Sequence, residues 1–186
     1  MLGETLRSQA DPDGTTTGGA PKAAARRAPL YTPEERRRRD ATRWTLVQGI
    51  LAPVQFAVFL VSLALVVRCL ATGEGYLAAS ISIVVKTLTL YAIMITGSIW
   101  EKVVFGRWLF ARPFFWEDVF SMLVLALHTA YLAALFGQGL GARGQMLLAL
   151  AAYAAYVINA AQFILKLRAA RLEAEATPPA LAGATS

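Results

Sequence analysis

Three acidic residues lie next to large aromatic side chains. Glu101 follows Trp100, and Glu117 and Asp118 follow Trp116. Partial removal of a carboxyl group from water favours its protonated form, so such a group can give a proton to a substrate and take one back. The sequence therefore predicts acid–base chemistry at these three residues. The alternative is helix capping, because a helix N-terminus favours negative charge and tryptophans gather at membrane interfaces.

A second group of polar residues lies within long apolar stretches, where an ionisable side chain is costly unless it faces a partner or a wet cavity. Lys86 and His128 are predicted near the bilayer midplane, and Gln55 at a similar depth. Lys86 has no acidic residue at its depth, so it either extends to the membrane surface, loses its proton or pairs with an anionic group, and a bound anionic or polar ligand is one answer. His128 has three open roles: metal ligand, proton carrier or hydrogen-bonded packing residue.

Helical spacing places these polar residues on shared faces. Gln48 lies seven residues before Gln55, and Asn159 three residues before Gln162. One stripe of the third apolar stretch contains Glu117, Ser121, Val124, His128 and Tyr131. Helices with these stripes turned inward would form a polar core that opens toward the cytoplasm. The alternative for the amides is interhelical hydrogen bonding, which contributes on the order of 0.6 kcal/mol per contact in membranes.

The composition excludes several classes of protein. Hydrophobic residues make up 56% of the 186 residues and charged residues 16%, whereas soluble domains average roughly 45–50% and about 25%. One Cys and one His exclude a disulfide framework and a Cys/His zinc site, so no protein metal site is predicted.

Four long stretches predict an all-α, multi-pass membrane protein. Each stretch has at least the roughly 20 residues that a helix needs to cross a hydrocarbon core. Lys86 is the only charged residue within any of these stretches. A soluble four-helix bundle would need polar outer stripes, which Val58–Val67 lacks. The four transmembrane helices are expected at about residues 44–68, 77–100, 118–136 and 145–167, within a membrane domain of residues 30–172.

Basic residues predict the orientation. They gather before the first span, between the second and third, and after the fourth, so both the N- and C-termini are expected in the cytoplasm. Residues 69–76 and 137–144 would then lie outside. Thr32, Pro33 and Glu35 predict a capped surface helix before the first span. Residues 1–29 and 173–186 are expected to be disordered tails, and nucleic-acid binding is not expected.

Several whole segments resemble the 2-vinyl bacteriochlorophyllide hydratases, also called chlorophyllide a 3-vinyl hydratases. The similarity covers about residues 30–172 and is carried by LYTPEERRRRDATRWTLVQGILAPVQF (30–56), IWEK (99–102), FFWED (114–118), ALHTAYL (126–132) and YVINAAQFILKLR (156–168). The resemblance implies a hydro-lyase of bacteriochlorophyll synthesis that adds water to the 3-vinyl group of a magnesium chlorin such as chlorophyllide. It also implies a bacterial inner, intracytoplasmic photosynthetic membrane and contact with other enzymes of that synthesis.

For the reaction that the resemblance implies, we assign each candidate residue an expected role as a hypothesis. Glu117 or Asp118 would donate the proton, and Glu101 would act as the base that positions water. The expected substrate-binding residues are Trp100, Trp116 and Phe115 against the ring, Lys86, Arg107 or Arg112 at the propionate, His128 at the magnesium or a ring substituent, and Asn159 and Gln55. Water is the co-substrate, and no cofactor is expected because the magnesium belongs to the substrate. The alternative is a non-enzymatic membrane pigment-binding or assembly factor.

Overall fold

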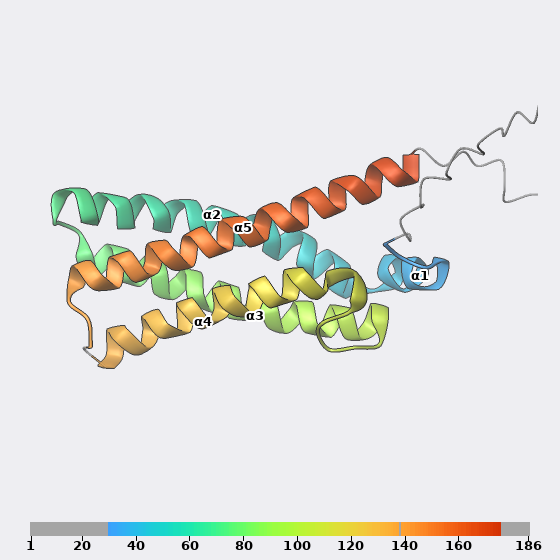
Figure 1. Ribbon diagram of the computed structural model, residues 1–186, viewed down its shortest axis with the longest axis horizontal. Helices are drawn as coiled ribbons and strands as arrows, with labels where there is room; N and C mark the ends of the chain where they lie inside the picture. Colours follow the sequence, from blue (N-terminus) through green and yellow to red (C-terminus); the bar gives the residue numbers. More distant parts are fainter. Residues whose placement is uncertain (1–29, 138, 176–186) are drawn as a thin grey trace, which may run out of the picture.

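The computed structural model describes residues 30–137 and 139–175, and every regular element in these ranges is helical. The elements are α1 (Pro33–Ala41), α2 (Arg43–Thr72), α3 (Tyr76–Phe105), the short 3-10 helix η1 (Arg112–Phe114), α4 (Phe115–Gly137) and α5 (Ala142–Glu175) (Figure 1). The predicted all-α fold class is therefore confirmed.

The chain is a multi-pass membrane protein. Among the described residues, four helices are long and apolar enough to cross a membrane, and at most 33% of each apolar window is buried in the protein. The remaining apolar surface needs lipid around it. The helices extend beyond the predicted spans: α3 runs to Phe105 and so includes Glu101. Pro53 lies inside α2 without ending it.

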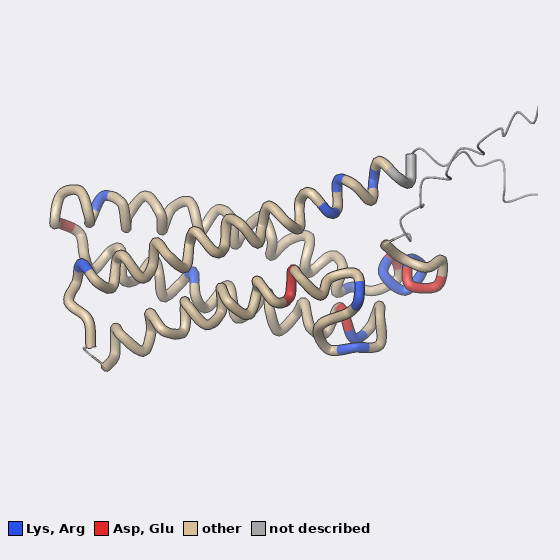
Figure 2. The backbone as a smooth tube through the Cα atoms, viewed as in Figure 1, with Lys and Arg blue, Asp and Glu red and all other residues tan. Residues whose placement is uncertain are grey.

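The four long helices form two antiparallel hairpins, α2 with α3 and α4 with α5. α5 also packs on α2, and α3 on α4 (Figure 1). Both ends of the described chain lie at one end of the bundle, together with α1 and the α3–α4 connection. We call this the charged end, because most Lys, Arg, Asp and Glu residues gather there (Figure 2). That the charged end faces the cytoplasm stays a prediction.

The tails predicted to be disordered lie largely outside the described residues. Residues 1–29 and 176–186 are not described, whereas residues 173–175 belong to α5 and not to a tail. α5 is therefore longer than the span predicted at 145–167.

The predicted capping box at the start of α1 is confirmed. The Glu35 amide donates to Thr32 Oγ1 at 3.3 Å, and the Thr32 amide donates to Glu35 Oε2 at 2.8 Å. No residue of α1 itself is buried. Tyr31, just before it, stacks on Phe105 of α3 with ring centroids 5.7 Å apart, so this aromatic contact helps to hold α1 against the bundle.

Two apolar clusters fix the helices around the polar interior. The larger one fills the part of the bundle away from the charged end, with Phe59, Ile83, Tyr131 and Tyr153 among its members. The smaller one lies at the charged end and contains Tyr31, Val104 and Phe114, packed by Trp100, Phe105 and Phe163. The acidic residues belong to the ends of α3 and α4 beside this second cluster.

Candidate active site

Glu101 and Asp118 form a buried carboxyl pair at the charged end. Glu101 comes from the last turns of α3 and Asp118 from the first turn of α4. Their side chains accept hydrogen bonds from the consecutive backbone amides of Ala111 and Phe110, respectively, which holds the two carboxyl groups close together. Both residues are buried, with 5% and 4% of their surfaces exposed. When two carboxyl groups lie close together out of water, a proton on one of them relieves the repulsion between two negative charges. The pair can therefore hold a transferable proton in a place largely closed to water.

The connection between α3 and α4 is tied to this pair through its backbone. The Phe110 amide donates to Asp118 Oδ2 at 2.7 Å, and the Ala111 amide donates to Glu101 Oε2 at 3.2 Å. Phe110 has a φ of 59°, a left-handed conformation that is unfavourable for a bulky residue. The two backbone hydrogen bonds hold this conformation and fix both carboxyl groups.

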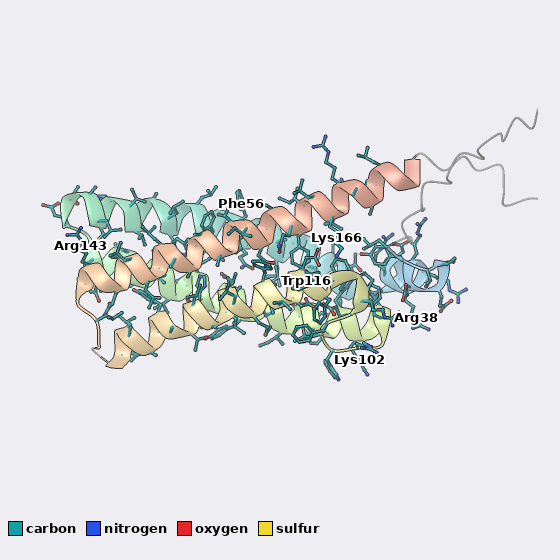
Figure 3. The ribbon with its side chains drawn as sticks, in the orientation of Figure 1. Arg38, Phe56, Lys102, Trp116, Arg143 and Lys166 are labelled. Atoms are coloured by element: carbon teal, nitrogen blue, oxygen red, sulfur yellow. The ribbon has the colours of Figure 1, made fainter. Side chains whose placement is uncertain are left out.

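Glu117 has a different partner from its neighbour Asp118. Lys166 of α5 donates to Glu117 Oε1 at 2.8 Å and to Oε2 at 2.7 Å. Figure 3 shows Lys166 on α5, and its ammonium also lies 5.0 Å from the centroid of the Phe114 ring. The two hydrogen bonds from Lys166 hold the Glu117 carboxyl group in a fixed position between α4 and α5.

A row of polar residues on α5 faces the start of α4. Asn159 Nδ2 donates to Ser121 Oγ at 2.8 Å. Nearer the charged end, Lys166 contacts Glu117. Gln162 lies between Asn159 and Lys166 on α5. The oxygens Asn159 Oδ1 and Gln162 Oε1 are buried and have no hydrogen-bond partner among the described residues.

The structure separates the three aromatic residues predicted to face one ring. Trp100 lies within the charged end, where its Nε1 donates to Thr45 Oγ1 at 2.9 Å and its ring contacts Phe114. Trp116 and Phe115 are exposed on the outside of α4, with Trp116 67% exposed (Figure 3). A ring in contact with Trp100 would lie inside the bundle, whereas a ring on Trp116 would lie at its surface.

Lys86 and His128 are brought near the same part of the core, away from the acidic residues. Both are completely buried. Lys86 Nζ lies 3.8 Å from the centroid of the Tyr156 ring, and the His128 ring lies 5.9 Å from that of Tyr153. A substrate could reach either residue only if the helices moved apart.

The hydrogen bonds of His128 leave one ring nitrogen free. His128 Nδ1 lies 2.8 Å from the carbonyl oxygen of Val124, and because a carbonyl only accepts, Nδ1 carries the hydrogen. Nε2 is then an acceptor, and it has no partner among the described residues. This nitrogen has the lone pair that an axial ligand of a substrate magnesium needs.

The other predicted residues lie at different depths. Gln55 is buried on α2, and its Oε1 has no partner among the described residues. Arg107 and Arg112 are exposed in the α3–α4 connection at the charged end. The buried stripe on α4 is as predicted, since Glu117, Ser121, Val124, His128 and Tyr131 are all buried.

Sequence reasoning missed the roles of Lys166 and of the Phe110 and Ala111 amides. Lys166 falls at the end of the predicted fourth span, and its helical spacing from Asn159 and Gln162 is the signal that indicates its role. A hollow of about 380 Å³ also lies between α2 and α3, lined by Ala57, Val58, Val61, Ser82 and Val85. It contains no ionisable group, and we assign it no chemistry.

Comparison with known proteins identifies the family. Residues 31–169 match the family described as 2-vinyl bacteriochlorophyllide hydratase. The chain belongs to the 2-vinyl bacteriochlorophyllide hydratase family. A protein of that name from Cereibacter sphaeroides is 68% identical over 158 residues, which cover 84% of this chain and 96% of the relative. Another from Rhodobacter capsulatus is 68% identical over 155 residues, or 83% and 90% of the two chains.

Membership in the 2-vinyl bacteriochlorophyllide hydratase family confirms the resemblance seen in the sequence segments. The match includes all the candidate residues described above, from Gln55 on α2 to Lys166 on α5. No solved structure matches the chain.

Proposed function

We propose that the protein adds water across the 3-vinyl group of chlorophyllide or a related bacteriochlorophyllide, giving the 3-(1-hydroxyethyl) derivative. Its relatives of 68% identity carry the hydratase name over nearly their whole length. The observation that favours a site for this chemistry is the buried carboxyl pair of Glu101 and Asp118, which two consecutive backbone amides hold together. It can supply the proton that starts hydration of a carbon–carbon double bond.

In the proposed reaction, a proton from the pair goes to the terminal vinyl carbon, and the double bond is lost. Positive charge at the inner carbon spreads into the macrocycle. Water then forms a carbon–oxygen bond at the inner carbon and releases one proton to a carboxylate. One water is consumed and the reaction has no net oxidation or reduction, so no redox cofactor takes part.

The surroundings of the acidic residues support a division of roles. Glu117 lies outside the Glu101–Asp118 pair, where Lys166 holds it at 2.7 Å, and we assign it the role of base, while Glu101 or Asp118 gives the proton. This differs from the assignment made on sequence, in which Glu101 was the base. Glu117 is adjacent to Asp118 in the chain. A proton taken up by Glu117 can therefore return to the Glu101–Asp118 pair after each turnover.

Substrate binding at the charged end is supported by the nearby groups. The propionate of the chlorin is negatively charged, and Arg107 or Arg112 in the exposed α3–α4 connection can pair with it near the membrane surface. Trp100 offers an aromatic face beside Glu101. Asn159 lies further from the charged end than Lys166, and it contacts Ser121 there.

Residues in the middle of the bundle would contact a ring that enters between the helices. We propose that His128 Nε2 is the axial ligand of the substrate magnesium and that Lys86 and Gln55 bind polar ring substituents. Each of these three has a buried polar atom without a partner among the described residues. Burial of a polar atom without a partner is unfavourable in free energy, and contacts with a bound ring would offset this.

We further propose that the protein works in the bacterial inner, intracytoplasmic photosynthetic membrane. There it would meet a membrane-soluble magnesium chlorin and other enzymes of the same synthesis. The apolar outer surfaces of its four long helices support the bilayer as its medium.

Incubation of the purified protein with chlorophyllide a in detergent tests the function. We expect a product heavier by one water. A pigment carrier would bind the chlorin tightly and return it with unchanged mass, and that result would replace the hydratase proposal with the pigment-binding alternative.

A further inference from the structure

The interface between α4 and α5 contains two acceptors that lack donors. Asn159 Oδ1 and Gln162 Oε1 are buried without a hydrogen-bond partner among the described residues. Asn159 is only 9% exposed. A buried acceptor without a donor costs on the order of 1–3 kcal/mol, so these two oxygens indicate a ligand that supplies hydrogens.

Contacts between α5 and α4 on either side of Gln162 fix this part of the interface. Asn159 Nδ2 donates to Ser121 Oγ at 2.8 Å, which orients the amide so that Oδ1 is left free. Gln162 lies three residues further along α5, on the same face as Asn159. Lys166, four residues beyond Gln162, contacts Glu117, and Glu117 lies one turn from Ser121 on α4.

Two acceptor oxygens on residues three positions apart on one helix suit a ligand with two donors. Water has two hydrogens to donate, and when both are given to amide oxygens, its lone pairs remain free to attack carbon. Glu117, held in position by Lys166, lies on the adjoining helix as the proposed acceptor of the released proton. Neither amide can act as a base, so their contribution would be to hold the water.

We propose that Asn159 and Gln162 bind the water that attacks the inner carbon of the vinyl group, with Ser121 orienting Asn159. This rests on the proposed hydratase function and adds the site of its second substrate. A water held in one place attacks the flat cation from one face and forms mainly one epimer of the new alcohol. Water from an unstructured pool would attack both faces.

The test uses Asn159→Leu and Gln162→Met in the full-length protein in detergent. We expect kcat to fall by roughly 10- to 100-fold with little change in KM for the chlorin, and the excess of one epimer to shrink, as measured by chiral chromatography. Gln162→Met removes only a half-buried amide, so it keeps the test decisive if Asn159→Leu does not fold.

Gln48→Leu is the matched control, because Gln48 is an amide of the same bundle that already has a partner, donating to Thr96 Oγ1 at 2.7 Å. We expect its epimer ratio to equal that of the wild type. An unchanged ratio and kcat in Gln162→Met, or equal epimers from the wild type, would overturn the water site. Absence of any hydration by the wild type would instead overturn the proposed function.

Discussion

Glu117 and Asp118 are consecutive residues, yet their carboxyl groups have different surroundings. Asp118 lies next to Glu101 and accepts the Phe110 amide, whereas Glu117 accepts two hydrogen bonds from Lys166. In the proposed reaction, these different partners give the two carboxyl groups different roles.

Amide substitution tests these roles. We expect Glu101→Gln and Asp118→Asn each to reduce turnover on the order of 10²- to 10⁴-fold, because either change removes a proton from the shared pair. Chlorin binding, followed by the shift of its absorption bands, should largely survive. Glu117→Gln should also reduce turnover by losing the base.

Two controls separate chemistry from stability. Glu34→Gln changes an exposed acid of α1, and its turnover should be normal. Lys166→Met leaves Glu117 without its ion pair, so its turnover should fall without removal of any carboxyl group. Near-normal turnover in all three acid variants would place the active site away from these residues, and His128 would be the next candidate.

His128 is the other residue whose role a substitution can decide. Its Nε2 has no partner among the described residues, so we expect His128→Ala to weaken binding of the magnesium chlorin and to leave affinity for the metal-free analogue nearly unchanged. Titration of the protein with both pigments measures this. If both pigments bind as before and only Tm falls, His128 is a packing residue.

At the scale of elements, the sequence predicts more of the fold than of the site. Charge-free length located all four spans, and local spacing predicted both the α1 capping box and the buried stripe on α4. The Glu117–Lys166 ion pair joins residues 49 positions apart, and the outward direction of Trp116 depends on how α4 packs. Such features follow from the packing of helices against each other, which local spacing does not specify.

The contact between Tyr31 and α3 gives a pH-dependent prediction. Burial raises the pKa of Tyr31 above its ordinary value of 10.0, although Arg39 partly offsets this. The folded state therefore keeps a proton that the unfolded chain loses first. The corresponding stability is fully present below about pH 10 and is lost as the pH rises through the folded pKa.

Tyr31→Phe cannot ionise, so its stability should fall less steeply than that of the wild type above about pH 10. Thermal unfolding of both proteins in detergent at increasing pH measures the difference, and the other tyrosines cancel because both proteins contain them. Parallel curves for the two proteins would show that the Tyr31 environment does not change on unfolding.

The whole molecule is asymmetric in charge. α1, the α3–α4 connection and the end of α5 carry most of the charged side chains, and the opposite end has few (Figure 2). Positively charged segments near membrane helices are retained in the cytoplasm. The acid pair would therefore face the cytoplasmic side, from which water and protons can reach it.

Reporter fusions test this orientation. Alkaline phosphatase is active only outside the cytoplasm, so fusions at Glu74 and Gly141 should be active and one at Arg107 silent. A cytoplasmic reporter such as β-galactosidase should give the opposite pattern at the same three positions. An active phosphatase fusion at Arg107 would reverse the orientation.

The central claim is that the Glu101–Asp118 pair supplies the proton for addition of water to a vinyl chlorin. The most direct measurement is a single-turnover reaction of purified wild type and Asp118→Asn with chlorophyllide a in heavy-oxygen water, followed by mass spectrometry. We expect the wild type to form a hydroxyethyl product containing the heavy oxygen, and Asp118→Asn to bind the chlorin but to form this product at least on the order of 10²-fold more slowly. Equal rates of labelled product from both proteins would contradict it.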